Sequence, residues 1–192
     1  MGNAISWIAF QDKTAAEAAE LLGLFPSGRL EQEPESMFCG VGLDNGWYVV
    51  VINEYGHKFV RERSLRRVSA TTDVIAAVIE EHVMFSSAEA WKNGNLVWKV
   101  THVSESGPRH LEEQGSLPAQ YGSVKDRLLA AQQREDERAH EVDYVFDLPL
   151  EIAEAIAGFK HDRMIDDRFE VLKPVTAAAG RGLLSRLFRE FS

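Results

Sequence analysis

The segment Asp73-Val-Ile-Ala-Ala-Val-Ile-Glu-Glu-His82-Val-Met-Phe85 continues through Ser86-Ser-Ala-Glu-Ala-Trp91-Lys92, Asn93-Gly94 and Asn95-Leu-Val-Trp98-Lys-Val100-Thr-His102-Val103. Its β-rich runs are joined by Asn-Gly, the strongest short-range signal of a β-hairpin, because both turn positions take a positive φ. A two-residue turn there predicts the cross-strand pairs Trp91 with Leu96 and Glu89 with Trp98. The first run starts with apolar residues on both faces, which predicts a central strand covered on both sides.

A second Asn-Gly pair, Asn45-Gly46, separates the β-rich runs Met37–Leu43 and Trp47–Asn53 and predicts another hairpin. A two-residue turn gives three cross-strand pairs: Leu43 with Tyr48, Val41 with Val50, and Cys39 with Ile52. Gly40 and Gly42 leave one face of this hairpin without side chains. A helix, an aromatic ring or a ligand is therefore expected to pack closely against that face.

Helix signals flank the two hairpins. Thr14 and Glu17 fit a capping box, in which each side chain satisfies a free backbone N–H, and they predict a helix over Thr14–Leu22. Other elements are expected by the same reasoning: helices over Arg61–Arg67, Ser123–Arg138 and Pro149–Ala157, and strands over Ala4–Phe10 and Val142–Phe146. The stretch after Gly23 and the stretch Ser104–Gly122 are rich in Gly and Pro, so both are predicted to be irregular.

These elements predict one mixed α+β domain over residues 1–176. A largely antiparallel sheet, built from two Asn-Gly hairpins and flanking strands, is expected to be covered by the helices. The residues predicted to form the core are Trp7, Ile8, Leu21, Val50, Ile52, Val78, Ile79, Val83, Trp98, Val100, Val145, Ile152 and Ile156.

Residues 177–192 differ from the rest of the chain. A small, glycine-containing hinge precedes an apolar stripe at helical spacing, formed by Leu183, Leu184, Leu187, Phe188 and Phe191. We expect this amphipathic helix to bury its stripe against its own domain or a second copy, because monomers rarely expose such a patch. Arginines beside the stripe leave attachment to a membrane surface as the alternative.

The charge balance limits the classes of partner. The chain has 30 acidic and 21 basic residues and a net charge of −9, which argues against general binding to nucleic acid and suits a basic partner. Cys39 is the single cysteine, which fits a reducing cytoplasm, and its apolar surroundings predict a buried core residue. No apolar run approaches the roughly 20 residues of a membrane span, and no signal peptide is expected.

The histidines of the central segment and the following stretch suggest one catalytic alternative. Two histidines and a carboxylate can hold a catalytic metal, so His82, His102 and His110 are candidate ligands for a metal-dependent hydrolase. The predicted register does not make His82 and His102 direct neighbours, and no His-x-His or His-Glu-x-x-His spacing supports the site.

The dipeptide His161-Asp162 is superficially similar to the metal-binding pair of the HD phosphohydrolases. The additional carboxylates lie too near in the sequence, and too little chain follows to supply a remote one. This stretch is interpreted as a solvated, turn-rich boundary after Gly158-Phe159.

The segment Glu80–Gly94, with the following Trp98-containing strand and the His102 turn, resembles a group of small uncharacterised bacterial cytosolic proteins. Proteins of this build are often immunity proteins, which neutralise secreted toxins. The resemblance covers mainly the first two-thirds of the chain and implies a class of function without implying any catalytic residue.

The sequence therefore predicts a non-enzymatic, acidic, cytoplasmic binding protein without a cofactor, with an immunity protein that occludes a toxin or effector as the named candidate. Such an inhibitor needs complementary shape and charge and no catalytic group. The expected contact residues are acidic and lie in the two irregular stretches: Glu31, Glu33, Glu35, Glu105, Glu112 and Glu113.

Overall fold

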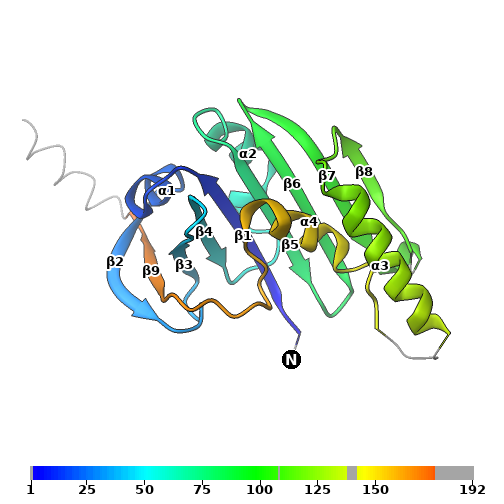
Figure 1. The fold of residues 1–192 in the computed structure, drawn as a ribbon. Coiled ribbons are helices and arrows are strands. Elements are labelled where there is room, and N and C mark those ends of the chain that lie inside the picture. Colours follow the sequence, from blue (N-terminus) through cyan, green and yellow to red (C-terminus); the bar gives the residue numbers. More distant parts are fainter. Residues whose placement is uncertain (1, 108, 138–141, 176–192) are drawn as a thin grey trace, which may run out of the picture.

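The computed structural model describes residues 2–107, 109–137 and 142–175. Within these residues, nine strands form one antiparallel sheet with the order β2-β9-β3-β4-β1-β5-β6-β7-β8 (Figure 1). The strands are β1 (Ala4–Gln11), β2 (Leu24–Glu31), β3 (Phe38–Gly42), β4 (Trp47–Ile52), β5 (Val74–Glu80), β6 (Phe85–Lys92), β7 (Asn95–Val103), β8 (Glu112–Gly115) and β9 (Phe169–Pro174). The helices are α1 (Ala15–Leu21), α2 (Glu62–Val68), α3 (Tyr121–Asp136) and α4 (Leu148–Ala157), with short 3₁₀ helices η1 (Lys58–Val60) and η2 (Ser104–Ser106). The predicted α+β class with a mainly antiparallel sheet is confirmed.

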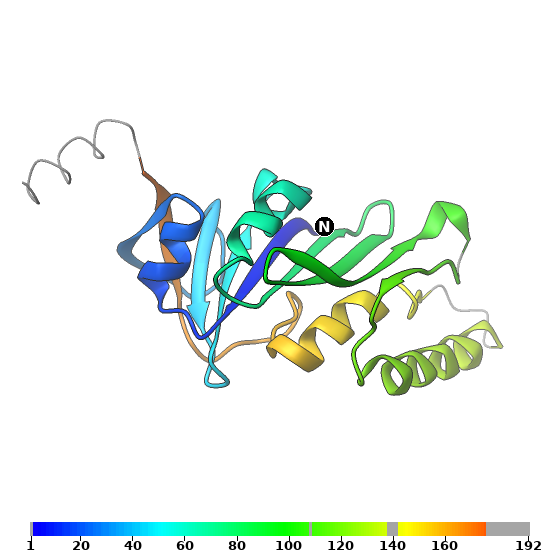
Figure 2. The ribbon, with the colours of Figure 1, turned by 90° about the horizontal axis from the view of Figure 1, so that it is seen from above.

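Helices cover both faces of the sheet. Figure 2 shows α1 and α2 on one side and α3 and α4 on the other. Successive residues of a strand point to opposite faces, so Trp7 and Ala9 of β1 join the core under α3 and α4, whereas Ile8 and Phe10 join the core under α1 and α2. The central strands are therefore apolar on both faces, as the sequence predicts for the start of β5.

Local signals place two of the helices. Thr14 and Glu17 form the predicted capping box at the start of α1. Gly158 ends α4 in the left-handed conformation, with a φ of 78°, which suits glycine because it has no Cβ. The helix predicted to begin at Ser123 begins at Tyr121 instead, and the short basic helix, α2, covers Glu62–Val68.

The hairpin of β3 and β4 differs from the predicted register by one residue. Val41 pairs with Val49, and Gly42 pairs with Tyr48. The turn is longer than two residues, because the backbone N–H of Leu43 donates to the carbonyl of Trp47 around a loop in which Gly46 has a φ of 85°. A glycine in the left-handed region is typical of three-residue hairpin loops with a bulge.

The bare face of this hairpin is occupied by an aromatic ring. A Cβ added to Gly40 would lie 2.0 Å from the hydroxyl oxygen of Tyr48. The sequence predicted a helix, an aromatic ring or a ligand against this face, and the structure places the ring of Tyr48 there.

The segment Asp73–Val103 contains three strands. The first run is broken into β5 and β6 by a turn, in which Met84 has a φ of 48°. Strands β6 and β7 meet around Asn93-Gly94 and pair Trp91 with Leu96. A bulge next to Trp91 then shifts the register, so Glu89 pairs with Lys99, and the predicted pair of Glu89 with Trp98 is wrong.

Several elements differ from the sequence predictions. The stretches predicted to be irregular contain β2 and β8, and the sheet also includes β9. Residues 142–146 contain no strand, and a turn covers 144–147, where the Asp143 carboxylate accepts hydrogen bonds from the backbone N–H groups of Val145 and Phe146. Val83, which was expected in the core, is 52% exposed in the turn before β6.

Of the other predicted core residues, most are buried and three are half-buried, namely Leu21, Val78 and Ile156. The predicted hinge and helix over residues 177–192 lie outside the described residues. Among the helices that are described, none has the length and apolar character needed to cross a bilayer.

Candidate functional site

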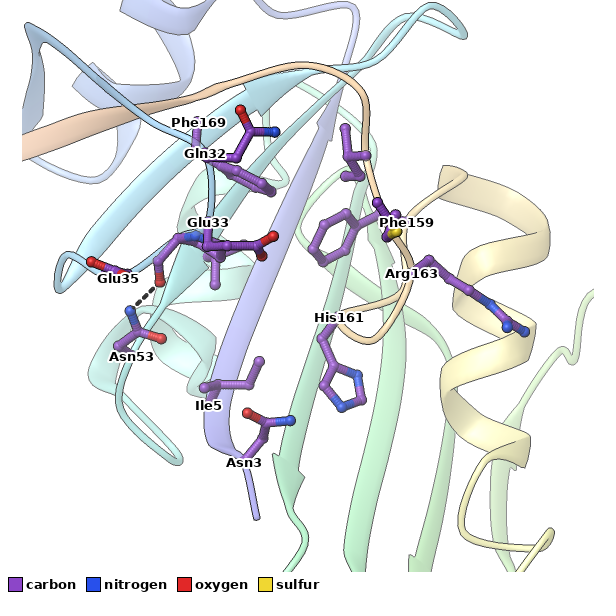
Figure 3. Close-up of a pocket in the computed structure, with 14 residues that line it drawn as sticks. Asn3, Ile5, Gln32, Glu33, Glu35, Asn53, Phe159, His161, Arg163 and Phe169 are labelled. Atoms are coloured by element: carbon purple, nitrogen blue, oxygen red, sulfur yellow. Dashed lines mark hydrogen bonds between the residues drawn. The ribbon is translucent and has the colours of Figure 1, made fainter. Parts of the chain in front are cut away.

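A small pocket opens on the α3/α4 face of the sheet, beyond the end of α4 (Figure 3). Its volume is about 220 Å³. It is bounded by the start of β1, the end of β4, the loop between β2 and β3, and the segment that follows α4. We call it the Glu33 pocket; its lining residues are Asn3, Ile5, Gln32, Glu33, Pro34, Glu35, Val51, Asn53, Phe159, His161, Arg163, Met164, Ile165 and Phe169.

One part of the Glu33 pocket is lined by apolar residues. Val51 and Phe169 are buried members of the core under α3 and α4, and Ile5 packs against that core. Phe159 stands edge-on to Trp7, with ring centroids 5.3 Å apart, which fixes the segment after α4 against the sheet. The pocket is therefore an extension of the core that the helices leave uncovered.

A buried polar group, His161, lies in the wall of this pocket. Its side chain is 3% exposed, and its Nε2 lies 3.1 Å from a carboxylate oxygen of Glu81. The other oxygen of Glu81 accepts a hydrogen bond of 2.7 Å from the backbone N–H of Asn3. Burial by itself would raise the pKa of Glu81, but the hydrogen bonds from Asn3 and His161 outweigh burial and hold this pKa below its usual range.

The second ring nitrogen of His161 is unpaired within the part of the chain that the structure describes. Nδ1 is buried and has no hydrogen-bond partner among the described residues. Because ionised Glu81 accepts from Nε2, that nitrogen carries the proton, and in the neutral ring Nδ1 is an acceptor. A buried acceptor without a donor is costly, so this nitrogen lowers the stability of the folded chain.

The rim opposite His161 is acidic. Glu33 and Glu35 are exposed on the loop between β2 and β3, and Figure 3 shows Glu33 directed across the pocket towards Phe159 while Glu35 points outward. The side-chain amide of Asn53 donates to the carbonyl oxygens of Pro34, at 2.6 Å, and of Ser36, at 2.7 Å. Asn53 therefore holds the loop, and with it Glu33, in place.

The segment after α4 contributes an apolar edge. Met164 is 95% exposed and lines the pocket. Arg163 extends across α4, away from the pocket, and its Nε lies 3.4 Å from a carboxylate oxygen of Glu154 (Figure 3). The positive charge of Arg163 is thus directed away from the pocket.

The acidic residues predicted as contacts do not form one surface. Glu31 accepts hydrogen bonds from the backbone and side chain of Ser36 and from the Cys39 thiol, and its side chain is only 8% exposed. It therefore fixes the β2–β3 loop. Glu33 and Glu35 lie at the pocket rim, near the β2 edge of the sheet. The other three lie near the opposite edge, with Glu105 in η2 and Glu112 and Glu113 in β8 (Figure 1).

The candidate metal ligands have separate partners. His82 lies 2.7 Å from Glu80 in the turn after β5. His102 is buried in β7 between Asp143, at 3.1 Å, and the carbonyl oxygen of His110, at 2.9 Å. The His110 ring contacts Glu112 at 3.4 Å. In the part of the chain that the structure describes, no group of three or more His, Cys, Asp or Glu side chains is arranged to hold a metal ion.

The sequence reasoning missed the pair of Glu81 and His161. It assigned His161 to a solvated boundary, which is wrong because the side chain is almost fully buried. The residues beside Glu81 in the sequence, Glu80 and His82, do not indicate its contact with His161, because only the tertiary fold brings the two segments together. The one local hint was the position of His161 two residues after the apolar Phe159.

Comparison of the chain with known protein families, with curated proteins and with solved structures finds no significant match. The residues described above are therefore the basis for assigning a function.

Proposed function

We propose that this chain is a non-enzymatic, acidic, cytoplasmic binding protein that receives a basic side chain of a protein partner in the Glu33 pocket. Within this class we propose an immunity protein that occludes a toxin or effector. The observation that carries the proposal is the Glu33 carboxylate, which is directed across a pocket that the apolar residues Ile5, Val51 and Phe159 help to line.

The size of the pocket favours a single side chain. Its volume of about 220 Å³ is below the roughly 300–1,000 Å³ that is common for small-molecule sites. Lysine and arginine combine an aliphatic stem with donor groups at the tip. The stem would contact Ile5 and Val51, and the tip would reach the Glu33 carboxylate.

The surroundings of the pocket suit a protein surface. Met164 offers a flexible apolar contact at the rim, as methionines do at adaptable binding surfaces. Glu35 adds a negative charge just outside the pocket, and the net charge of −9 attracts a basic partner at long range. Occlusion of a partner's site would require these contacts and no bond making or breaking.

The proposal is tested by titrating the isotopically labelled full chain with acetyl-arginine amide and following the backbone NMR signals. We expect shifts at residues 32–35 and at His161, and weaker binding by tenfold or more in E33Q, because a hydrogen bond to a charged group contributes about 1.5–3 kcal/mol. The matched control is E105Q/E112Q, which removes two carboxylates at the other edge of the sheet and should bind normally.

Two results would overturn the proposal. One is equal binding of acetyl-citrulline amide, which has the shape of arginine without its charge. The other is unchanged binding in E33Q. The immunity role is tested separately, by capture of partners from the native host with wild-type chain and with E33Q/M164A. Recovery of a basic protein by the wild type alone supports it, and recovery of the same proteins by both chains counts against it.

A further inference from the structure

A cluster of cations lies on the α1/α2 face of the sheet, opposite the Glu33 pocket. We call it the arginine surface; it consists of Lys58 in η1, Arg61, and Arg63, Arg66 and Arg67 in α2. All five residues are exposed. Figure 2 shows α2 on the side of the sheet away from α3 and α4.

Most of these charges have no acidic partner. Arg66 pairs with Glu62 at 2.9 Å. The Nε of Arg61 donates only to the carbonyl of Gly56, at 3.4 Å, and no ion pair is present at Arg63 or Arg67 within the described residues. Some other cations, namely Arg29, Lys92, Lys125 and Arg127, each pair with a carboxylate.

This arrangement costs stability in the isolated chain. Arg63 and Arg67 are four residues apart on one helix face, and like charges at this spacing repel each other. The composition does not force the arrangement, because acidic residues outnumber basic ones by 30 to 21. Binding of an anionic partner would offset the repulsion.

The arginine surface is also hollowed. One hollow, of about 600 Å³, lies among the arginine stems and Phe59. A second, of about 500 Å³, shares Arg61 and Arg66 with the first and extends to Trp91 and Leu96 of the neighbouring strands. The guanidinium of Arg66 lies over the Trp91 ring, 5.7 Å from its centroid, which positions this side chain between the two hollows.

We infer that the arginine surface binds an acidic segment of a second protein, whose carboxylates pair with the arginines while its apolar side chains enter the hollows. Arginine presents a planar fork of donors that matches a carboxylate. Glu62 and Glu89 also border the second hollow and would repel a continuous phosphate backbone, whereas separated carboxylates can avoid them. The surface therefore fits an acidic polypeptide better than a nucleic acid.

This inference does not depend on the proposed function. The two sites lie on opposite faces of the sheet and attract ligands of opposite charge. A chain with both sites can hold a basic protein on one face and an acidic segment on the other.

The test uses a fluorescein-labelled peptide of alternating Glu and Leu residues and the full chain, with binding measured by fluorescence anisotropy. We expect R63E/R67E to weaken binding at least tenfold, and binding to weaken with added salt as exposed charges are screened. The matched control, R168E/K173E, reverses two exposed cations near the other end of the sheet and should bind as the wild type does. E33Q should also bind the peptide normally, which separates this result from the arginine titration.

Three outcomes would overturn the inference: equal binding by R63E/R67E, equal weakening in the R168E/K173E control, or tighter binding of a labelled single-stranded oligonucleotide than of the peptide. Thermal unfolding of each variant checks that it is folded. If R63E/R67E does not fold, R63Q/R67Q replaces it, with weaker peptide binding expected and unchanged binding contradicting the inference.

Discussion

Nε2 of His161 lies 3.1 Å from a carboxylate oxygen of Glu81, although the two residues are 80 positions apart in the chain. The contact joins the turn between β5 and β6 to the segment after α4. Through Glu81 it also reaches Asn3 at the start of β1, whose backbone and side chain donate to the same carboxylate. Three separate parts of the chain therefore meet at one wall of the Glu33 pocket.

Replacement of Glu81 by Gln is expected to lower the free energy of unfolding by about 1–3 kcal/mol at pH 7, since charged hydrogen bonds are lost. The pKa of Glu81 is lowered in the folded chain, so its contribution is present above the unfolded pKa of roughly 4.3 and is lost as the pH falls through the folded pKa. Urea denaturation of wild type and E81Q at pH 7 and pH 3 measures this. A difference that persists undiminished at pH 3 contradicts the charge-based account, and E105Q, at an exposed glutamate, is the control.

The pair of His102 and Asp143 predicts a second pH dependence. Burial alone would lower the pKa of His102, but the hydrogen bonds to Asp143 and to the carbonyl of His110 outweigh burial and raise it. Hydrogen bonds from His102 and from the backbone of Phe146 and Val145 hold the pKa of Asp143 low in spite of burial.

A raised histidine pKa contributes stability below the unfolded value of about 6.5, and this is lost as the pH rises through the folded value. The Asp143 contribution is lost as the pH falls below about 3.9 towards its folded pKa. The wild type should therefore exceed D143N in stability most clearly between about pH 4 and 6.5. Asn keeps an oxygen for the backbone N–H groups of Val145 and Phe146, so denaturation of D143N across pH 4–9 isolates the charge. A constant difference across this range would contradict the prediction.

Substitution of Gly40 by Ala is expected to destabilise the hairpin of β3 and β4 by about 1–3 kcal/mol or more, as overpacking does. The added Cβ would lie 2.0 Å from the hydroxyl oxygen and 2.7 Å from the ring carbon Cζ of Tyr48. The substitution should cost less in a Y48A background, where the ring is absent, and chemical denaturation of the four chains gives the coupling. Equal costs in both backgrounds would show that the ring is not responsible.

Removal of the Tyr48 hydroxyl is expected not to destabilise the protein. Its hydroxyl is buried and has no hydrogen-bond partner among the described residues, and burial, with the negative charge of Glu170, raises its pKa. Because a buried unpaired hydroxyl is costly, Y48F is expected to be as stable as the wild type or more stable. A loss of more than about 1 kcal/mol in denaturation would indicate a hydrogen bond that the structure lacks.

Cys39 is expected to be inert in the folded protein. Burial, together with the hydrogen bond and negative charge of Glu31, raises the pKa of its thiol to about 12, and the thiolate is the reactive form. Iodoacetamide at pH 8 should leave the native chain unmodified and alkylate it fully in guanidinium, as measured by mass spectrometry. Rapid alkylation of the native chain would contradict this prediction.

The parts of the fold that follow from the sequence are those with local causes. The capping box of Thr14 and Glu17 and the helix end at Gly158 depend on residues within one helical turn. The register predicted for β3 and β4 was wrong, because one additional residue in the turn at Gly46 shifts every cross-strand pair of the hairpin. Strand β9 is stabilised by pairing with β2 and β3, and no pattern within its six residues indicates these distant partners.

The candidate site was predictable only in part. Exposed Glu33 and Glu35 follow from an acidic, proline-containing stretch, although the sequence placed Glu31 with them while the structure gives Glu31 a fixed role in the loop. The Glu81–His161 contact depends on packing across the sheet, and neither residue has a motif. The charge of the arginine surface is visible in the sequence, whereas its hollows depend on β6 and β7 beside α2.

The position of β9 between β2 and β3 has a consequence for protein synthesis. The ribosome completes β3 early, but the strand that joins it to β2 comes near the end of the described chain, which at 5–20 residues per second is a delay of about 6 to 25 s. Until β9 is made, β2 and β3 each have an unpaired edge, and unpaired strand edges can pair with other chains. Protection of these edges during translation, by a chaperone or by slow closure of the sheet, would determine how much newly made protein reaches its native state.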